Sequence, residues 1–514
     1  MVLIGLVLTV GTCFPAVSYG EPGQSDSTDY EYYDENGYLI NEEIEDAVAV
    51  NEITPDTSWF NFYRDPDKSY TISTEEQLFG LASLVNEQQA MWKQNRFETF
   101  EGVTFELAND IALTHPWTPI GSDDYITFRG VFDGNGYTIS GLDVDMTGDY
   151  AGFFGYLSGK VKDLKLTGSV RTTGGKAGAF AGYMAKGSKV LRCTSEVSIS
   201  AGAETGGIAG YNDLGTLRKC INRGRVIGTI KVGGVVGENW GSVSCCGNYG
   251  PVTSSQRGMT TYGTGGVAGR SVSVDSSIDC CFNTGVIESA TEGTGGIAGY
   301  TNSNGASITN SYNTGTVSVK NETSHALDNL TEDTAKGYAG GIVGIVGTKG
   351  VKIENCYHAG KILNNQISGG IIGKYENVSK VRDDSYIVNN YYIKQDVNYG
   401  VGIDTSGKSR NIRGGTTTVS ASSLTISAAS LGPHYISDSG GVYGNRCLPV
   451  LDWQQPLAED EVQYLTGIPI DVQQNLNAYM NGDSKGRTEG KTLRLFLGHC
   501  DVIAKTTGDE NHAN

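Results

Sequence analysis

The chain has 514 residues and a formal net charge of −19. Because nucleic acids are recognised through basic surfaces, this acidic balance excludes a nucleic-acid partner, and it disfavours an anionic polymer unless a metal ion intervenes. The 72 glycines stand against 11 prolines and follow no collagen period, and the hydrophobic fraction of 38% fits a thin core drawn out along an axis.

Residues 1–20 are predicted to be a signal peptide, because an apolar run over 2–10 precedes the small residues Ala16, Val17 and Ser18. A basic start is missing, and Thr12 before Cys13 makes a poor lipoprotein signal, so plain export is expected. The run is too short for a conventional membrane span, and no transmembrane segment is expected beyond it. Residues 21–57 contain acidic residues but no Lys or Arg, which predicts a disordered linker.

Residues 58–150 are predicted to form an N-terminal cap and the first coils of a repeat structure. A short strand is expected at 69–72. Thr74-Glu-Glu-Gln77 then forms a capping-box pattern before Leu78, so a helix is expected to about residue 86, as the N-terminal cap. Short apolar segments at 103–107, 109–113, 117–121 and 128–142 follow it.

Residues 151–395 repeat one phrase, as in Gly295-Gly-Ile-Ala-Gly299. A period of roughly 30 residues indicates a solenoid, a propeller or an array. The anchoring glycine of the phrase recurs at Gly152, Gly178, Gly207, Gly234, Gly266, Gly296, Gly341 and Gly370.

A second phrase follows each anchor, and its best copy is Ile308-Thr-Asn-Ser-Tyr-Asn-Thr-Gly-Thr-Val317. Its first and tenth positions are aliphatic. Its fourth position holds Leu164, Cys193, Cys220, Cys246, Cys281, Ser311 and Cys356, and its sixth holds Leu166, Ser195, Asn222, Asn248, Asn283, Asn313 and His358.

These columns predict stacked strands, because runs of two to four β-branched or small residues bounded by glycine are short strands rather than helices. Residues of one column occupy the same place in successive coils, about 4.8 Å apart. We therefore expect a column of small buried side chains, mostly free thiols, and a column of asparagines that bond to each other and to the turns. The glycines are expected to allow positive φ and close backbone approach. Cys245 and Cys280 share the third position and are a candidate stacked pair.

The Gly-Gly-Ile-Ala-Gly-Tyr and Asn-Ser-Tyr-Asn-Thr-Gly-Thr-Val phrases resemble the GLUG repeat of bacterial surface proteins over residues 70–453. That repeat occurs in adhesin-like proteins and in non-catalytic regions of some IgA-cleaving metallopeptidases. The resemblance implies a secreted, surface-displayed β-solenoid that serves adhesion or interaction. Two long steps, at 254–263 and 318–337, predict surface loops, which in solenoids often lie on a binding face.

Residues 396–453 are predicted to form C-terminal coils and a cap, with a short helix within 421–431 and an apolar strand and Trp453 closing the last coil. Residues 454–514 are predicted to form a small helical or mixed appendage whose role is undetermined. No LPxTG sorting signal follows.

Candidate carboxylate pairs are weak. Asp123-Asp124 and Asp383-Asp384 are adjacent, so on a strand they would point to opposite faces, and Asp133 is expected to serve a turn. The motifs of pectate lyases and polygalacturonases are missing, as is His-Glu-x-x-His. We therefore predict no catalytic, cofactor-binding or metal-ligating residue and no cofactor.

We interpret the chain as an all-β protein: a right-handed parallel β-helix (β-solenoid) with a short N-terminal capping helix and a small C-terminal appendage. Its expected role is a secreted or cell-surface adhesion module or stalk for a host protein, a cell-surface protein or a glycan, as a monomer or part of a larger assembly. Two alternatives stay open: a polysaccharide-active lyase or hydrolase, and a non-catalytic segment of a larger surface protease or adhesin.

Overall fold

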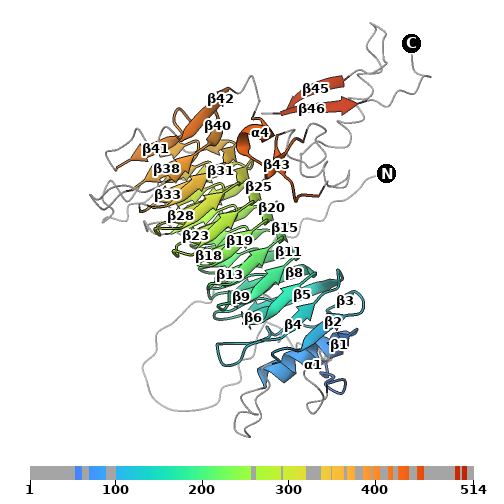
Figure 1. Cartoon of the computed structure of the whole chain (residues 1–514). Coiled ribbons are helices and arrows are strands. Elements are labelled where there is room, and N and C mark those ends of the chain that lie inside the picture. Colours follow the sequence, from blue (N-terminus) through green and yellow to red (C-terminus); the bar gives the residue numbers. More distant parts are fainter. Residues whose placement is uncertain are drawn as a thin grey trace, which may run out of the picture. The chain divides into compact units, whose positions relative to one another are not determined.

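The structure of the protein is a computed structural model (Figure 1). It describes residues 53–60, 69–87, 100–255, 262–290, 293–319, 337–348, 350–363, 367–376, 386–394, 397–405, 415–420, 426–438, 448–455, 492–497 and 500–505. The predicted signal peptide, most of the acidic linker and most of the loop at 318–337 lie outside the described residues, as do Cys13 and Cys447.

The N-terminal cap is the predicted one. Helix α1 (Glu75–Asn86) begins at Thr74, whose side chain accepts a hydrogen bond from the Gln77 N–H. Oε1 of Gln77 in turn accepts a hydrogen bond from the Ser73 N–H at 2.8 Å. In a regular capping box this second bond would come from the N–H of Thr74, so here it is shifted by one residue. The buried Leu78, Leu81, Ala82 and Val85 join the main core, so the helix covers the first coils.

One face of the coils is an 11-stranded sheet, and every neighbouring pair in it is parallel. Its order is β1 (Ser69–Ile72), β2 (Thr104–Leu107), β4 (Val131–Asp133), β7 (Lys160–Lys162), β10 (Lys189–Leu191), β14 (Thr216–Arg218), β19 (Ser242–Ser244), β24 (Ser277–Asp279), β29 (Ser307–Thr309), β34 (Lys352–Glu354) and β39 (Tyr386–Val388).

The second face is a 16-stranded sheet whose ladders carry the fifth, sixth and tenth positions of the second phrase. It contains β3 (Ile111–Ala112), β5 (Thr138–Met146), β8 (Lys165–Thr172), β11 (Thr194–Ser200), β15 (Ile221–Asn222), β16 (Val226–Gly228), β20 (Gly247–Asn248), β21 (Val252–Ser254), β25 (Phe282–Asn283), β26 (Ile287–Ser289), β30 (Tyr312–Asn313), β31 (Val317–Val319), β35 (Tyr357–His358), β36 (Ile362–Leu363), β40 (Asn390–Lys394) and β42 (Thr416–Ser420).

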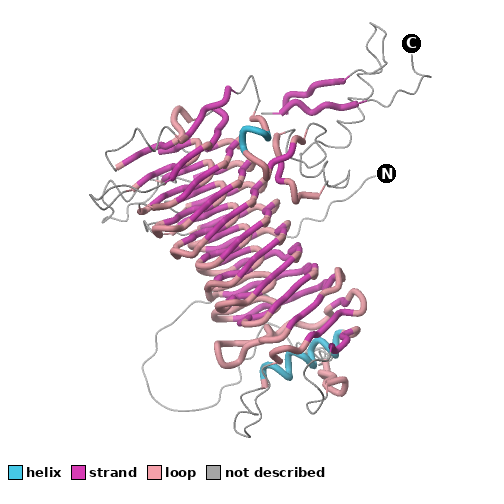
Figure 2. Tube along the Cα trace, viewed as in Figure 1, coloured by secondary structure: helices cyan, strands magenta, loops and turns pink. Residues whose placement is uncertain are grey.

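Two further sheets complete each coil. A nine-stranded sheet contains β6 (Phe154–Leu157), β9 (Ala181–Met184), β13 (Ala209–Asn212), β18 (Val236–Asn239), β23 (Ala268–Ser271), β28 (Ala298–Thr301), β33 (Val343–Val346), β38 (Ile372–Tyr375) and β41 (Val401–Asp404). A six-stranded sheet contains β12 (Thr205–Gly206), β17 (Val232–Gly233), β22 (Gly263–Gly265), β27 (Gly293–Gly295), β32 (Tyr338–Gly340) and β37 (Ile367–Gly369). Figure 2 shows these strands stacked coil on coil, which confirms the parallel β-solenoid.

The asparagine column is confirmed as a continuous chain of hydrogen bonds between side-chain amides. Nδ2 of Asn222 donates to Oδ1 of Asn248 at 2.9 Å, Asn248 donates to Asn283 at 2.7 Å, and Asn283 donates to Asn313 at 2.8 Å. His358 ends the column, with its Nδ1 3.0 Å from Nδ2 of Asn313. Since the five side chains are almost completely buried, these bonds satisfy polar groups that would otherwise destabilise the core.

The thiol column is also buried, and its cysteines are free. Each thiol bonds to the carbonyl two residues earlier; for Cys281 this is the Asp279 carbonyl, at 3.2 Å. Burial raises the pKa of the Cys356 thiol to about 12. These thiols therefore pack as small core side chains, as predicted.

Of the two reasons predicted for the anchoring glycines, close backbone approach is confirmed and positive φ is not. A Cβ at Gly207 would lie 2.4 Å from the Asn222 side chain and 2.2 Å from the Gly234 carbonyl, so close approach is the requirement. Positive φ falls elsewhere, on the third position of the second phrase, where the residues are not glycines. That position holds Asp163, Arg192, Lys219, Cys245, Cys280, Asn310 and Asn355, with φ between 47° and 55°.

The prediction for Trp453 was wrong in its location. Helix α4 (Ala428–Leu431) and the antiparallel pair β43 (Tyr435–Ile436) and β44 (Val450–Leu451) belong to a covering segment, residues 426–438 and 448–455. Instead of closing the last coil, Trp453 donates from Nε1 to the Cys280 carbonyl at 2.9 Å. The covering segment packs against the outer side of earlier coils. There the fifth position of the second phrase holds large aromatic residues, which the segment buries.

The described part of the C-terminal appendage is an antiparallel hairpin of β45 (Thr492–Leu497) and β46 (Cys500–Lys505). The rest of the predicted helical or mixed appendage, residues 456–491, 498–499 and 506–514, lies outside the described residues.

Candidate functional site

The feature most suited to contact a partner is a stack of tyrosines on the outer side of the nine-stranded sheet. Tyr156 and Tyr183 stack with ring centroids 4.6 Å apart, and Tyr183 and Tyr211 stack at 5.1 Å with an interplanar angle of 9°. Each ring follows the last glycine of its anchor phrase, and the residue after the ring, such as Met184 or Asn212, is buried. We call Tyr156, Tyr183 and Tyr211 the open tyrosine column.

Two exposed aromatic rings lie near the ends of this column. Trp240 is 6.1 Å from the Tyr211 ring and 37% exposed. Tyr125 is 66% exposed and follows Asp124, whose charge contributes to raising the pKa of Tyr156, although burial is the larger cause. Since the inner rings cover each other's faces, Trp240 and Tyr125 present the accessible aromatic surface.

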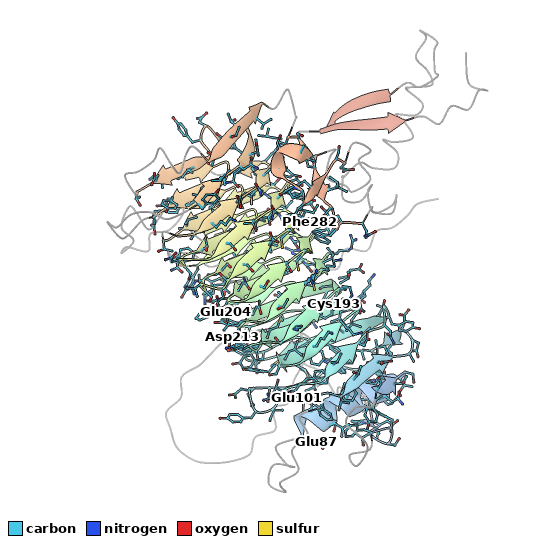
Figure 3. All side chains as sticks on the ribbon, viewed as in Figure 1. Glu87, Glu101, Cys193, Glu204, Asp213 and Phe282 are labelled. Atoms are coloured by element: carbon cyan, nitrogen blue, oxygen red, sulfur yellow. The ribbon has the colours of Figure 1, made fainter. Side chains whose placement is uncertain are left out.

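Carboxylates lie along the same flank. The Tyr183 hydroxyl donates to Oδ2 of Asp213 at 3.0 Å, and burial together with this bond raises the pKa of Tyr183. In Figure 3, Glu204 and Asp213 lie on one side of the coils and Phe282 on the other.

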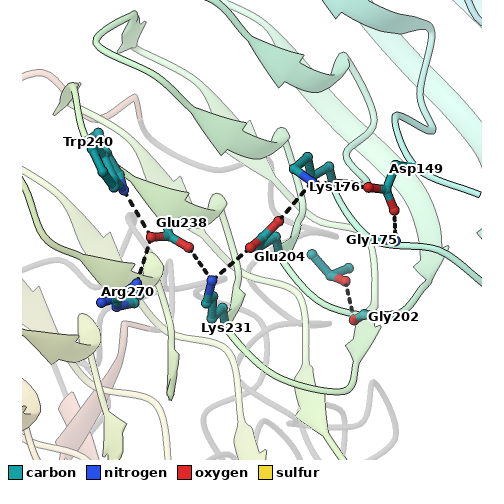
Figure 4. A network of polar contacts seen from close by, with 10 residues as sticks. Asp149, Gly175, Lys176, Gly202, Glu204, Lys231, Glu238, Trp240 and Arg270 are labelled. Atoms are coloured by element: carbon teal, nitrogen blue, oxygen red, sulfur yellow. Dashed lines mark hydrogen bonds and ion pairs between the residues drawn. The ribbon is translucent and has the colours of Figure 1, made fainter. Parts of the chain in front are cut away.

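An alternating ion network supports the flank (Figure 4). Lys176 contacts Asp149 at 3.1 Å and Glu204 at 3.6 Å, and Lys231 contacts Glu204 at 2.7 Å. The network continues through Glu238, which contacts Lys231 at 2.5 Å and Arg270 at 2.9 Å and also accepts from Nε1 of Trp240 at 2.9 Å. Three anions thus alternate with three cations across successive coils.

Lys231 is the centre of the network. Burial alone would lower the pKa of its ammonium group, but the bonds to Glu204 and Glu238 outweigh burial and raise it. Glu238 is only 2% exposed and therefore depends on its two cationic partners. Through Glu238, the network also holds the Trp240 indole in place.

The predicted carboxylate pairs do not converge. Oδ1 of Asp123 accepts from the Tyr125 and Ile126 N–H groups, both at 2.8 Å, and Asp133 accepts from the Asn135 N–H at 3.0 Å and contacts Lys162. The turn role expected for Asp133 is therefore present, whereas Asp383 and Asp384 lie outside the described residues. The carboxyl groups with a shifted pKa are all lowered: Asp56, Glu75, Asp149 and Asp163.

The described part of the chain contains no group of three or more His, Cys, Asp or Glu side chains that could hold a metal ion. No helix there is both long and apolar enough to cross a membrane.

The open tyrosine column was missed in the sequence, although a signal was present. An aromatic residue recurs directly after the last glycine of the anchor phrase, at Tyr156, Tyr183 and Tyr211. Trp240 and Glu238 could not be found in this way, because they depart from the repeated pattern.

Comparison with known proteins identifies no family. No family model matches the chain, and no curated protein matches it. Among solved structures, one similar chain is a Bacteroides ovatus protein provisionally named an immunoglobulin A1 protease, with 19% identity and a TM-score of 0.36; the match covers 76% of this chain and 93% of that one. Another is an IgA1 protease, with 17% identity and a TM-score of 0.35, where 63% of this chain matches 21% of the other.

Proposed function

We propose that this protein is a secreted or surface-displayed β-solenoid of GLUG-repeat type that binds neutral glycans through the flank of the open tyrosine column. The observation that carries the proposal is the exposure of two aromatic rings, Trp240 directly after β18 and Tyr125 in the loop after Gly121, together with carboxylates on the same flank. Aromatic rings pack against the apolar faces of sugars, and carboxylates accept hydrogen bonds from sugar hydroxyls.

The charge of the flank supports a neutral rather than an acidic ligand. Asp124 and Asp213 add negative charge beside a network whose own anions and cations balance. The whole chain carries −19, so a glycan bearing carboxylate or sulfate groups would be repelled.

A polysaccharide-active enzyme remains the alternative, but the flank gives it little support. A general acid working near neutral pH needs a raised carboxyl pKa. The resolved carboxyl shifts are downward, and Glu204 and Glu238 are both bonded to Lys231. We therefore propose a non-catalytic binding module or stalk, acting alone or within a larger surface protein, in preference to an enzyme.

The test is binding of the purified chain to an array of neutral and acidic glycans, with mass spectrometry of each bound glycan after incubation. We expect saturable binding to neutral glycans without product. Trp240→Ala and Tyr125→Ala should each weaken it by roughly tenfold, since one good aromatic contact contributes about 1–1.5 kcal/mol.

Tyr386→Ala is the matched control, because Tyr386 is 50% exposed but lies on the 11-stranded sheet. It should leave binding unchanged. Equal losses in all three variants would contradict the assignment of the flank, and shortened or unsaturated sugar products would establish the enzyme alternative.

A further inference from the structure

The third-position column suggests a covalent site between two coils. Every residue of this column adopts the left-handed backbone conformation, which places its side chain at an outer corner. Cys245 and Cys280 occupy this column on neighbouring coils, between the paired residues Ser244 and Asp279 on one side and Gly247 and Phe282 on the other.

Other neighbours in the column are cross-linked by their side chains. Arg192 bonds to Asp163 with two contacts of 2.5 and 2.6 Å. Nδ2 of Asn355 donates to Oδ1 of Asn310 at 3.1 Å, and Asn389 donates to Asn355 at 2.8 Å. The two cysteines thus occupy the position at which ion pairs and hydrogen bonds between side-chain amides connect other neighbouring coils.

We propose that Cys245 and Cys280 form a disulfide, the covalent counterpart of these cross-links, when a disulfide-bearing oxidant is available. In-register neighbours on parallel strands lie about 4.8 Å apart, which falls within the Cα separation of roughly 4.4–6.8 Å seen in disulfides. The disulfide would join two coils whose intervening sequence contains the long step at 254–263. It would lie beside Trp453, which donates a hydrogen bond to the Cys280 carbonyl.

The chemistry is thiol–disulfide exchange in two steps. The Cys245 thiolate attacks the oxidant's disulfide and expels one of its sulfurs as a thiol. The Cys280 thiolate then attacks Sγ of the mixed disulfide at Cys245 and expels the second thiol. Two electrons and two protons pass from the pair to the oxidant, which leaves as two thiols.

The surroundings favour Cys245 as the attacking group. A hydrogen bond with the Cys280 thiol lowers the pKa of Cys245, and the charges of Arg218 and Lys219 lower it further against burial and the charge of Asp279. Cys245 is also partly exposed, whereas Cys280 is 4% exposed. An oxidant can therefore reach Cys245 first.

The thiol column is an internal control. Cys220, Cys246 and Cys281 also lie on successive coils, but they are completely buried and bonded to backbone carbonyls. An oxidant has no route to them in the folded protein, so they should stay reduced.

The test treats the reduced, folded full chain with oxidised glutathione and then alkylates it in denaturant, digests it without reduction and sequences the cross-linked peptides. We expect one disulfide, between Cys245 and Cys280, with Cys193, Cys220, Cys246, Cys281 and Cys356 alkylated. Because each cysteine of the pair adjoins a column thiol, the assignment is repeated in Cys246→Ser/Cys281→Ser, which uses the residue found at Ser311.

The matched control is Cys245→Asn/Cys280→Asn, which installs the residue found at Asn310 and Asn355. It should fold and yield no such cross-link. Alkylation of both Cys245 and Cys280 after oxidation, or a disulfide from either of them to another cysteine, would overturn the proposal. The result is independent of glycan binding.

Discussion

Two stacks of aromatic rings run along this solenoid, and they differ in what covers them rather than in how they stack. Tyr183 and Tyr211 stack at 5.1 Å and 9°, and Tyr312 and Tyr357 stack at 5.0 Å and 8°. We call Phe282, Tyr312 and Tyr357 the covered column, because all three are completely buried. Stacking is therefore a product of the repeat, and only the covering segment decides which stack can meet a ligand.

The two stacks are also held by different forces. In the covered column, the Tyr312 hydroxyl donates to Oε1 of Gln454 at 3.0 Å and the Tyr357 hydroxyl donates to the Pro449 carbonyl. These bonds are neutral. The open tyrosine column instead lies beside ion pairs, so the two flanks should respond differently to mutation, salt and acid.

The largest expected difference follows truncation of one ring in each stack. Tyr312→Ala should cost about 3–5 kcal/mol of unfolding free energy, because it leaves a large cavity under the covering segment. Tyr183→Ala, at a half-buried position, should cost about 1 kcal/mol. Urea unfolding of both variants measures this, and equal losses would show that the covering segment contributes nothing.

Loss of the central cation should destabilise the open flank by a smaller amount. Lys231→Met leaves Glu204 without its closest cation and Glu238 with Arg270 alone. We expect a loss of about 2–3 kcal/mol, below the value of about 3–5 for a fully buried pair. Stability measured against salt concentration is the check: the wild type should weaken with salt, and the variant should weaken less.

Filling one glycine should disturb the covered column alone. A Cβ at Gly247 would lie 2.2 Å from the Phe282 ring, so Gly247→Ala should cost about 1–3 kcal/mol through overpacking. In a background carrying Phe282→Ala the same change should be nearly neutral. A double-mutant cycle measures the coupling, and an unchanged cost in that background would contradict the contact.

The smallest effect concerns acid. The Gly175 N–H donates to Asp149 at 2.8 Å, and this bond together with Lys176 holds the Asp149 carboxyl pKa below its ordinary value. A lowered folded-state pKa gives stability that is present above the unfolded pKa, near 4, and is lost as the pH falls through the lowered value. Asp149→Asn should therefore flatten the acid limb of the stability curve, whereas Tyr312→Phe should leave its slope unchanged.

Much of the fold could be predicted because each column repeats the same physical environment. The asparagines at 222, 248, 283 and 313 predict a continuous chain of hydrogen bonds between side-chain amides, and the cysteines at the fourth position predict a column of small buried side chains. The role of the anchoring glycine was harder to predict, since close approach to an asparagine on another face depends on how the coil closes.

The covering segment and the candidate site could not be predicted by the same means. Trp453 contacts a carbonyl 173 residues earlier, and nothing in its local sequence indicates that partner. The ion network likewise joins residues such as Glu204, Lys231 and Glu238 whose order follows no repeated pattern. The covering segment and the ion network are formed by residues that do not recur from coil to coil, so their contacts become visible only in the folded structure.

The most direct test of the account is oxidative footprinting of the intact chain, alone and with the neutral glycan that binds best on the array. Without glycan, Tyr125 and Trp240 should be labelled rapidly, and Phe282, Tyr312 and Tyr357 should be labelled slowly. Added glycan should protect Tyr125 and Trp240 and leave Tyr386 unchanged. Rapid labelling of Tyr312 and Tyr357, or protection confined to residues away from the open tyrosine column, would contradict the account.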